Sequence, residues 1–133
     1  MKYFLDTNIC IYAIKRRPET IIERLRRLHP REIGLSSITV AELRYGADNS
    51  FHPVKNHHIV DAFLSPFSIE AFTQDAAEHY GRLVTHLKKN GTPIGTMDAL
   101  IAAHALAKDV ILVSNNLKEF KRVPGLKHEN WIE

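Results

Sequence analysis

A short apolar run that ends abruptly in an acid constrains this chain more than any other feature. Residues 3–5 (Tyr-Phe-Leu) are followed by Asp6, and then by the polar pair Thr7 and Asn8. An apolar run bounded in this way predicts a buried strand that presents a carboxylate at its carboxyl end. The residues from Thr7 onward have the pattern of a helix, so the chain opens as a strand followed directly by a helix.

The same arrangement recurs three times along the chain. Residues 33–37 lead to Glu42, residues 91–95 lead to Asp98, and residues 110–113 lead to Ser114, Asn115, Asn116 and Glu119. We interpret each of the three leading segments as a strand. In an open parallel sheet, sites form outside the carboxyl ends of the strands, so we expect the acids to gather at one edge.

Strands that alternate with helices predict an α/β fold with a parallel sheet covered by helices on both faces. The apolar periodicity and the helix stop signals, such as Asn90-Gly91, place six helices. We expect them at residues 7–14, 18–28, 39–47, 54–64, 73–90 and 97–108, with a final edge strand at 126–132. A chain of 133 residues is long enough for one core, and we treat residues 1–133 as a single domain.

The composition excludes several classes. No run of 18 apolar residues is present, so we expect no membrane-spanning helix. The only cysteine, Cys10, cannot form an internal disulfide, which suits a reducing cytoplasm. Cys10 lies among apolar residues, so we interpret it as a buried structural thiol.

The charge pattern is mildly basic and clustered. The formal net charge is +3, and most of the basic residues fall in clusters at 15–17, 24–31, 88–89 and 118–122. Basic clusters around an acidic centre suit a polyanion held over a metal site. Each cluster is equally explained as the solvated face of a helix.

Each acid also has a purely structural explanation. Asp6 could cap the first helix, Thr39 and Glu42 have the spacing of a capping box, and Asp98 lies in the first turn of a helix, where a negative charge is favoured. Glu119 could be a solvated residue beside lysines. Together the acids favour a metal, because several neighbouring carboxylates cannot all stay ionised without a cation between them.

Other chemistries find little support. The chain has no Gly-x-x-x-x-Gly-Lys loop, no Gly-x-Gly-x-x-Gly and no Gly-x-Ser-x-Gly. The eight histidines lack the spacing of zinc ligands. We interpret His104, within the apolar helix, as a core histidine with its hydrogen bonds satisfied.

Four motifs together resemble the PIN-domain ribonucleases, and specifically the VapC toxins of bacterial toxin–antitoxin pairs. They span residues 4–8, 36–46, 94–105 and 112–120. The resemblance implies a three-layer α/β/α fold with a twisted, mostly parallel central sheet. It also implies that Asp6, Glu42 and Asp98 are acids of the site. The fourth acidic position falls on Asn116, which departs from the commoner Asp; nearby Glu119 could supply the charge, and Ser114, Thr7 and Asn8 would support the site.

The resemblance further implies an endoribonuclease that depends on Mg²⁺ or Mn²⁺, with structured RNA such as initiator tRNA as substrate. Asp6, Asp98 and Glu42 would hold the metal. Proteins of this kind form homodimers and are silenced by a VapB-like antitoxin. Two other functions stay open: a non-catalytic module that binds nucleic acid or protein, and a metal-dependent DNA nuclease.

Overall fold

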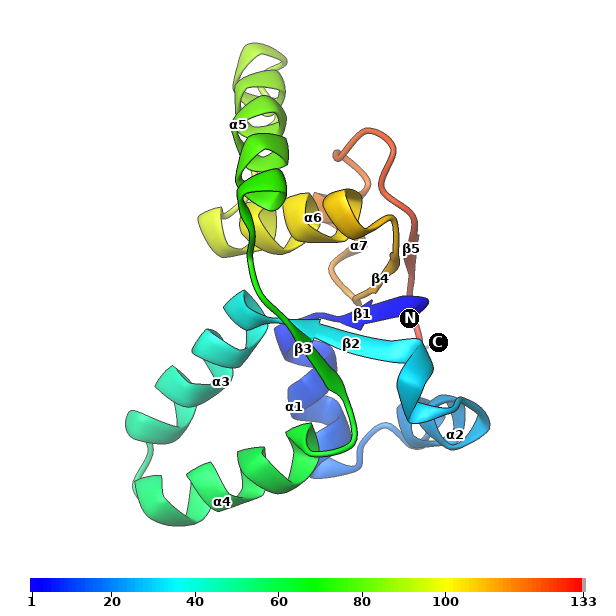
Figure 1. The fold of residues 1–133 in the computed structure, drawn as a ribbon, viewed down its shortest axis with the longest axis vertical. Coiled ribbons are helices and arrows are strands. Elements are labelled where there is room, and N and C mark those ends of the chain that lie inside the picture. Colours follow the sequence, from blue (N-terminus) through cyan, green and yellow to red (C-terminus); the bar gives the residue numbers. More distant parts are fainter. Residues whose placement is uncertain (133) are drawn as a thin grey trace.

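A parallel sheet forms the middle layer of the computed structural model, which describes residues 1–132 (Figure 1). Five strands in this range have the order β3-β2-β1-β4-β5, and each neighbouring pair is parallel. Their bounds are β1 Tyr3–Leu5, β2 Ile33–Ser36, β3 Ser68–Glu70, β4 Ile111–Val113 and β5 His128–Glu129.

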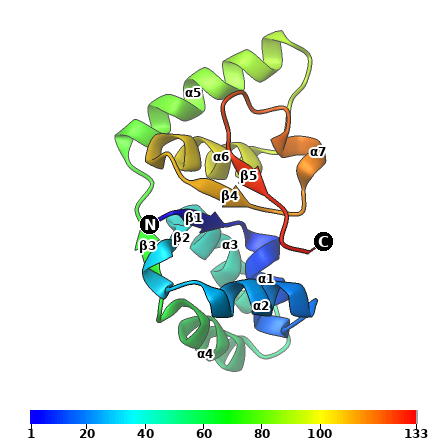
Figure 2. The same cartoon turned by 90° about the vertical axis from the view of Figure 1, so that its right-hand side faces the viewer.

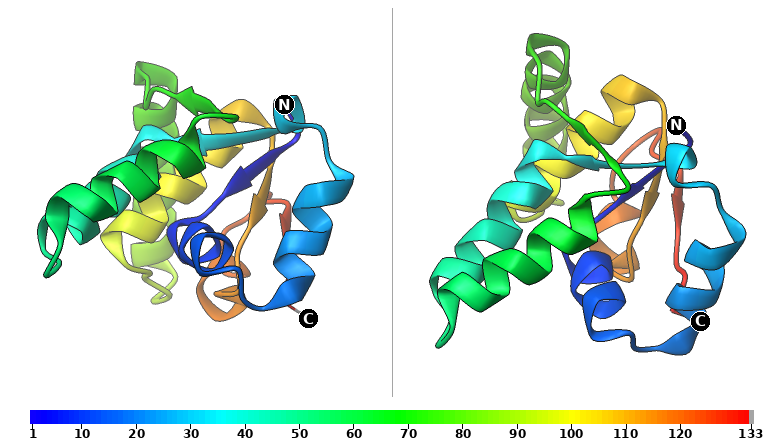
Figure 3. Two further views of the ribbon diagram at one scale, coloured as in Figure 1. Left: turned by 90° about the horizontal axis from the view of Figure 1, so that it is seen from below. Right: turned by 60° about the horizontal axis from the view of Figure 1, so that its bottom comes forward.

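Helices cover both faces of the sheet. Figure 2 shows α1 to α4 on one face and α5 to α7 on the other. Their bounds are α1 Thr7–Lys15, α2 Glu19–Arg27, α3 Ser37–Asp48, α4 Pro53–Leu64, α5 Gln74–Lys89, α6 Thr96–Lys108 and α7 Leu117–Phe120, with a 3-10 turn at Pro30–Glu32. The α3 and α4 helices pack side by side as a hairpin that extends beyond the sheet (Figure 3). The predicted three-layer α/β/α architecture is confirmed.

The two cores follow from the alternation of side chains along the first strand. Tyr3 and Leu5 join a cluster with α1, α3 and α4, and Tyr3 packs edge-to-face on Trp131 at 5.2 Å between ring centroids. Phe4 points the other way, into a cluster with α5 and α6. Because successive strand residues face opposite sides, three consecutive apolar residues bury both faces of the central strand. Cys10 is buried in the first cluster, as predicted.

Residues 91–95 are not a strand, so that prediction was wrong. Gly91 follows α5 with φ of +67°, which ends the helix at Asn90 as predicted. The segment then connects α5 to α6, which pack against each other on one face of the sheet. A connection between two helices on the same face need not cross the sheet. Asp98 therefore reaches the site from the start of a helix and not from a strand.

The predicted capping box at Thr39 and Glu42 is also absent. The α3 helix begins at Ser37, and the hydroxyl of Ser36 caps it by accepting a hydrogen bond of 3.1 Å from the Ile38 amide. This places Thr39 inside the first turn and leaves the Glu42 carboxylate free to face another element.

Two smaller boundaries differ from the predictions. The α6 helix begins at Thr96, with Gly95 and not Thr96 at the N-cap position. The final edge strand is confirmed, but only His128–Glu129 pair with β4. In residues 1–132, no helix has the length and apolar character needed to cross a membrane.

Candidate active site

The carboxyl ends of three neighbouring strands meet at one edge of the sheet. Asp6 follows β1, Ser36 ends β2, and Ser114 follows β4. Because β1 lies between β2 and β4 and all three are parallel, Asp6 occupies the middle of this edge. The sequence thus places a carboxylate at the point where an open α/β sheet forms its sites.

Asp6 is 4% exposed and has a structural role as well as an electrostatic one. Its Oδ1 accepts a hydrogen bond of 2.9 Å from the Ile9 amide and caps α1. Burial raises the pKa of Asp6 to about 6; the Ser114 hydroxyl and the Ile9 amide oppose that shift, and the charge of Glu42 adds to it. The predicted capping role is confirmed. The same carboxyl group is harder to ionise than usual because it is buried.

Glu42 reaches this edge from α3. Its Oε1 accepts a hydrogen bond of 2.5 Å from the Thr7 hydroxyl, which belongs to the residue directly after Asp6. The bond fixes one carboxylate oxygen of Glu42 beside the start of α1. The sequence predicts Thr7 as a supporting residue of the site. In the structure, Thr7 contacts the site by donating this hydrogen bond to Glu42.

The side chain of Asn116 lies between the carboxylates of Asp98 and Glu119. The Asn116 amide nitrogen lies 3.3 Å from Asp98 Oδ2 and 3.1 Å from Glu119 Oε2. The pKa of Asp98 is raised to about 7 by burial, by a hydrogen bond to Glu119, and by the charges of Glu119, Asp6 and Glu42. The hydrogen bond from Asp98 lowers the pKa of Glu119. Each carboxyl group therefore shifts the pKa of the other, upward for Asp98 and downward for Glu119.

The remaining predicted site residues differ in their surroundings. Ser114 is buried, and its hydroxyl accepts a hydrogen bond of 2.9 Å from the backbone N–H of Asn116. Asn8 is exposed in the first turn of α1, and across residues 1–132 we find no hydrogen bond from its side chain to the acids. The structure thus brings together every predicted site residue except Asn8.

The donor chemistry fits a hard divalent cation. Carboxylate oxygens from four elements lie around one edge. Burial raises the pKa values of Asp6 and Asp98, and the charges of the neighbouring carboxylates add to the shift. In the described part of the chain, no three His, Cys, Asp or Glu side chains already form a ligand group. Asp6, Glu42, Asp98 and Glu119 are the side chains that would hold a cation at this edge, and their positions would have to adjust to do so.

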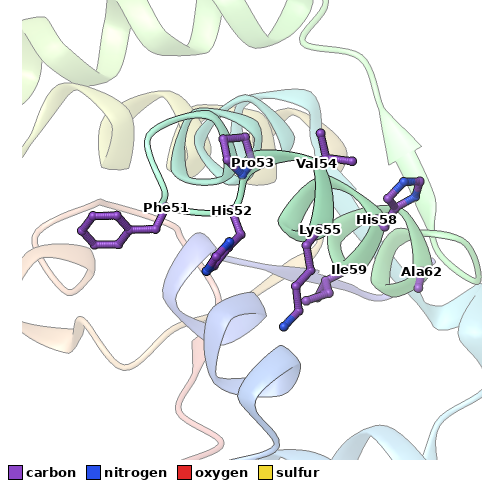
Figure 4. A pocket seen from close by; sticks show the side chains of 8 residues that line it. All are labelled: Phe51, His52, Pro53, Val54, Lys55, His58, Ile59 and Ala62. Atoms are coloured by element: carbon purple, nitrogen blue, oxygen red, sulfur yellow. The ribbon is translucent and has the colours of Figure 1, made fainter.

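A groove of about 540 Å³ begins beside these acids. It runs between α1, α3 and α4, and Glu42 and Lys15 line it together with apolar residues such as Ile11 and Val60. A second hollow, of about 850 Å³, lies at the start of α4 (Figure 4). Its lining contains no acid, so its volume does not mark it as the place of the chemistry.

The basic clusters are not all free to meet a polyanion. Arg24 pairs with Glu129 at 3.0 Å and lies 5.0 Å from the ring of Trp131, so it attaches α2 to the C-terminal segment. Lys118 and Lys121 are exposed on and directly after α7, the helix that carries Glu119. Positive charge therefore flanks the acids along α7, and Lys15 supplies it in the groove.

Known proteins resemble this chain over nearly its whole length. The PIN domain family model matches residues 3–126. The chain belongs to the PIN-domain family. Within it, the chain is 48% identical to Ribonuclease VapC2 of Haemophilus influenzae, over 99% of both chains. It is 42% identical to a tRNA(fMet)-specific endonuclease VapC of Salmonella typhimurium, over 98% of both.

Solved structures lead to the same family. The crystal structure of VapBC2 from Rickettsia felis, bound to a DNA fragment from their promoter, superposes with a TM-score of 0.92. Its matching chain is 44% identical, and the match covers 98% of this chain and 99% of that one. These relatives identify the chain as a PIN-domain protein of the VapC ribonuclease group.

Proposed function

We propose that this PIN-domain protein is a toxic endoribonuclease that hydrolyses RNA phosphodiester bonds with Mg²⁺ or Mn²⁺. The observation that carries the proposal is the gathering of Asp6, Glu42 and Asp98, with Glu119, at the carboxyl edge of the sheet. The raised pKa values of Asp6 and Asp98 are expected of buried neighbouring carboxylates, whose ionised form a bound cation would stabilise.

The residues would divide the work as follows. Asp6 and Asp98 are the principal metal ligands, and Glu42 is a third, directly or through water. A bound divalent cation would supply an activated water and stabilise the charge that develops on the phosphate. Glu119 lies beside the neutral Asn116 and adds the negative charge that Asn116 does not supply. The Ser114 hydroxyl orients Asn116 by accepting a hydrogen bond from the backbone N–H of Asn116.

Exposed basic side chains would hold the RNA backbone, with an affinity that falls as salt rises. The tRNA(fMet)-specific relative supports initiator tRNA as a substrate. VapBC complexes of relatives support a VapB-like antitoxin as partner, and the largely apolar groove beside Glu42 is a suitable place for a segment of it. We further propose a homodimer that acts in the cytoplasm.

Conservative substitution of the two principal ligands tests the proposal. Asp6→Asn and Asp98→Asn should abolish cleavage of tRNA in Mg²⁺ and relieve growth inhibition, with the fold intact by circular dichroism. Asp109→Asn is the matched control, because Asp109 is an exposed carboxylate whose side chain is 85% accessible and pairs with Lys127. Wild-type rates in either ligand variant would refute the metal assignment.

The same assay separates the alternative functions. Cleavage of DNA and not tRNA would indicate a DNA nuclease. Binding of RNA without cleavage in Mg²⁺ or Mn²⁺ would indicate a non-catalytic module. We favour catalysis because the acid set is complete apart from Asn116.

A further inference from the structure

A buried histidine lies behind the acids and has no part in the proposed chemistry. His104 is fully buried on α6, the helix that begins near Asp98. Its Nδ1 lies 2.7 Å from the hydroxyl oxygen of Ser36. Its Nε2 is buried without a hydrogen-bond partner, so the prediction of a satisfied core histidine was only half right. An incompletely satisfied polar ring in a core is costly and calls for an explanation.

The neighbouring groups indicate which partner donates in the hydrogen bond between His104 and Ser36. The Ser36 oxygen accepts the Ile38 amide as the cap of α3. The backbone of Ala71 favours a proton on the ring, and because Nδ1 faces the Ser36 hydroxyl, we assign that proton to Nε2. Nδ1 is then an acceptor, and the Ser36 hydroxyl donates to it. Burial, followed by the charge of Lys108, lowers the pKa of His104 against the opposing charge of Glu70, so the ring is neutral.

The ring also touches the other elements of the site. Phe4, two residues before Asp6 in β1, packs edge-on at 5.0 Å between ring centroids. Phe72, which follows β3, packs edge-on at 5.4 Å. The Phe72 amide donates a hydrogen bond of 3.0 Å to the hydroxyl of Ser37, the first residue of α3. One side chain therefore joins the strand that ends in Asp6, the cap of the helix of Glu42 and the helix of Asp98.

We infer that His104 is a positioning residue: through Ser36 it sets the start of α3 against α6, and so sets the separation of Glu42 from Asp98. This inference rests on the proposed metal-dependent function. It assigns no contact with metal or RNA to His104, whose ring is sealed from the site by burial. Partners that orient metal ligands through other groups commonly alter metal affinity without binding the ion.

The test measures Mn²⁺ binding by titration calorimetry, separately from RNA cleavage. His104→Phe keeps an aromatic ring between Phe4 and Phe72 but removes Nδ1. We expect Mn²⁺ affinity to fall about tenfold, with kcat reduced and KM for RNA unchanged. His104→Asn should recover much of the affinity, because its amide oxygen can accept from Ser36 at the Nδ1 position.

A matched control separates positioning from general loss of packing. Ile101→Ala also removes buried volume from α6, in the cluster with Phe4, and should lower the melting temperature while leaving Mn²⁺ affinity unchanged. Equal losses of affinity in His104→Phe and Ile101→Ala would overturn the inference, as would wild-type affinity in His104→Phe.

Two further results complete the design. If His104→Phe does not fold, Ser36→Ala and His104→Asn decide: the first should weaken Mn²⁺ binding and the second should largely keep it, and the reverse order would overturn the inference. If the wild-type protein itself binds no Mn²⁺, the proposed function fails first. Failure of the inference alone is recognised by normal Mn²⁺ binding in both the wild type and His104→Phe.

Discussion

The Thr7 hydroxyl donates a hydrogen bond of 2.5 Å to Oε1 of Glu42 and joins the start of α1 to the middle of α3, two helices that follow neighbouring strands. Hydrogen bonds to a carboxylate are stronger than those between neutral groups. The bond occupies one oxygen of Glu42 and leaves the other for a cation or a water. Thr7 is thereby linked to two acids: to Asp6 by a peptide bond, and to Glu42 by a hydrogen bond from its side chain.

We predict that Thr7→Val reduces cleavage by about tenfold and raises the Mg²⁺ concentration needed for half-maximal rate. Valine keeps the branched shape but cannot donate, so Glu42 loses its fixed orientation. Thr7→Ser keeps the hydroxyl and should retain most activity. Rates measured across a Mg²⁺ titration check the prediction, and equal titrations for Val and Ser would contradict it.

Glu42→Gln should lose most cleavage at little cost in stability. The structure removes the capping-box explanation for Glu42, and Gln can still accept from Thr7 through its amide oxygen. We expect the free energy of unfolding to change by less than about 0.5 kcal/mol. Glu78→Gln, on the exposed face of α5, is the matched control. Full activity in Glu42→Gln would remove Glu42 from the catalytic set.

The strands and helices that the sequence predicted correctly are those with strong local signals. The run at residues 3–5 faces two cores, so it is apolar throughout, and Asp6 ends it because its carboxylate caps the next helix. The α5 helix ends at Asn90-Gly91 because Gly91 adopts a positive φ. Such signals depend on a few adjacent residues, which makes them readable without the fold.

The features that escaped prediction depend on contacts between distant residues. Ser36 and His104 are 68 positions apart, and nothing local marks Ser36 as both helix cap and histidine partner. Arg24 belonged to a basic cluster in the sequence, but the fold brings it to Glu129 and Trp131. Residues 91–95 had a strand-like pattern, which the packing of α5 against α6 overrode.

Asp6 and Asp98 should destabilise the metal-free protein as pH rises. The pKa of Asp6 is raised from its ordinary value of 3.8 to about 6, and that of Asp98 from 3.8 to about 7. From about pH 4 to about pH 7, these two carboxyl groups bind more protons in the folded protein than in the unfolded chain, so their contribution to stability falls as pH rises. The lowered pKa values of Glu119 and His104 act in the opposite direction. The shift of Asp6 alone corresponds to on the order of 3 kcal/mol.

Denaturant unfolding in EDTA between about pH 4 and about pH 8 measures this loss. Mg²⁺ should reverse it at the upper end, because a cation bound to the folded state offsets the repulsion. Asp6→Asn should flatten the profile in EDTA and abolish most of the response to Mg²⁺. A wild-type stability that rises with pH in EDTA would contradict the assigned shifts.

Asn116→Asp should keep its cleavage activity and become more dependent on Mg²⁺ for stability. The substitution restores the commoner acid at this position but removes the amide that bridges Asp98 and Glu119. Three carboxylates would then meet without a donor between them when no cation is bound. Melting temperatures with EDTA and with Mg²⁺ measure the change; an inactive variant that binds Mg²⁺ normally would show that the Asn116 amide itself is required.

Glu119→Gln should weaken metal-dependent cleavage, but by less than Asp6→Asn does. Glu119 is the weaker member because it lies near the surface on a short helix, and its charge reaches the site through Asp98 and Asn116. Gln keeps the shape and removes the charge, so the rate should need more Mg²⁺ to reach its maximum. Glu78→Gln, which makes the same change on the exposed face of α5, is the control. An unchanged Mg²⁺ dependence in Glu119→Gln would remove Glu119 from the site and leave a centre of Asp6, Glu42 and Asp98.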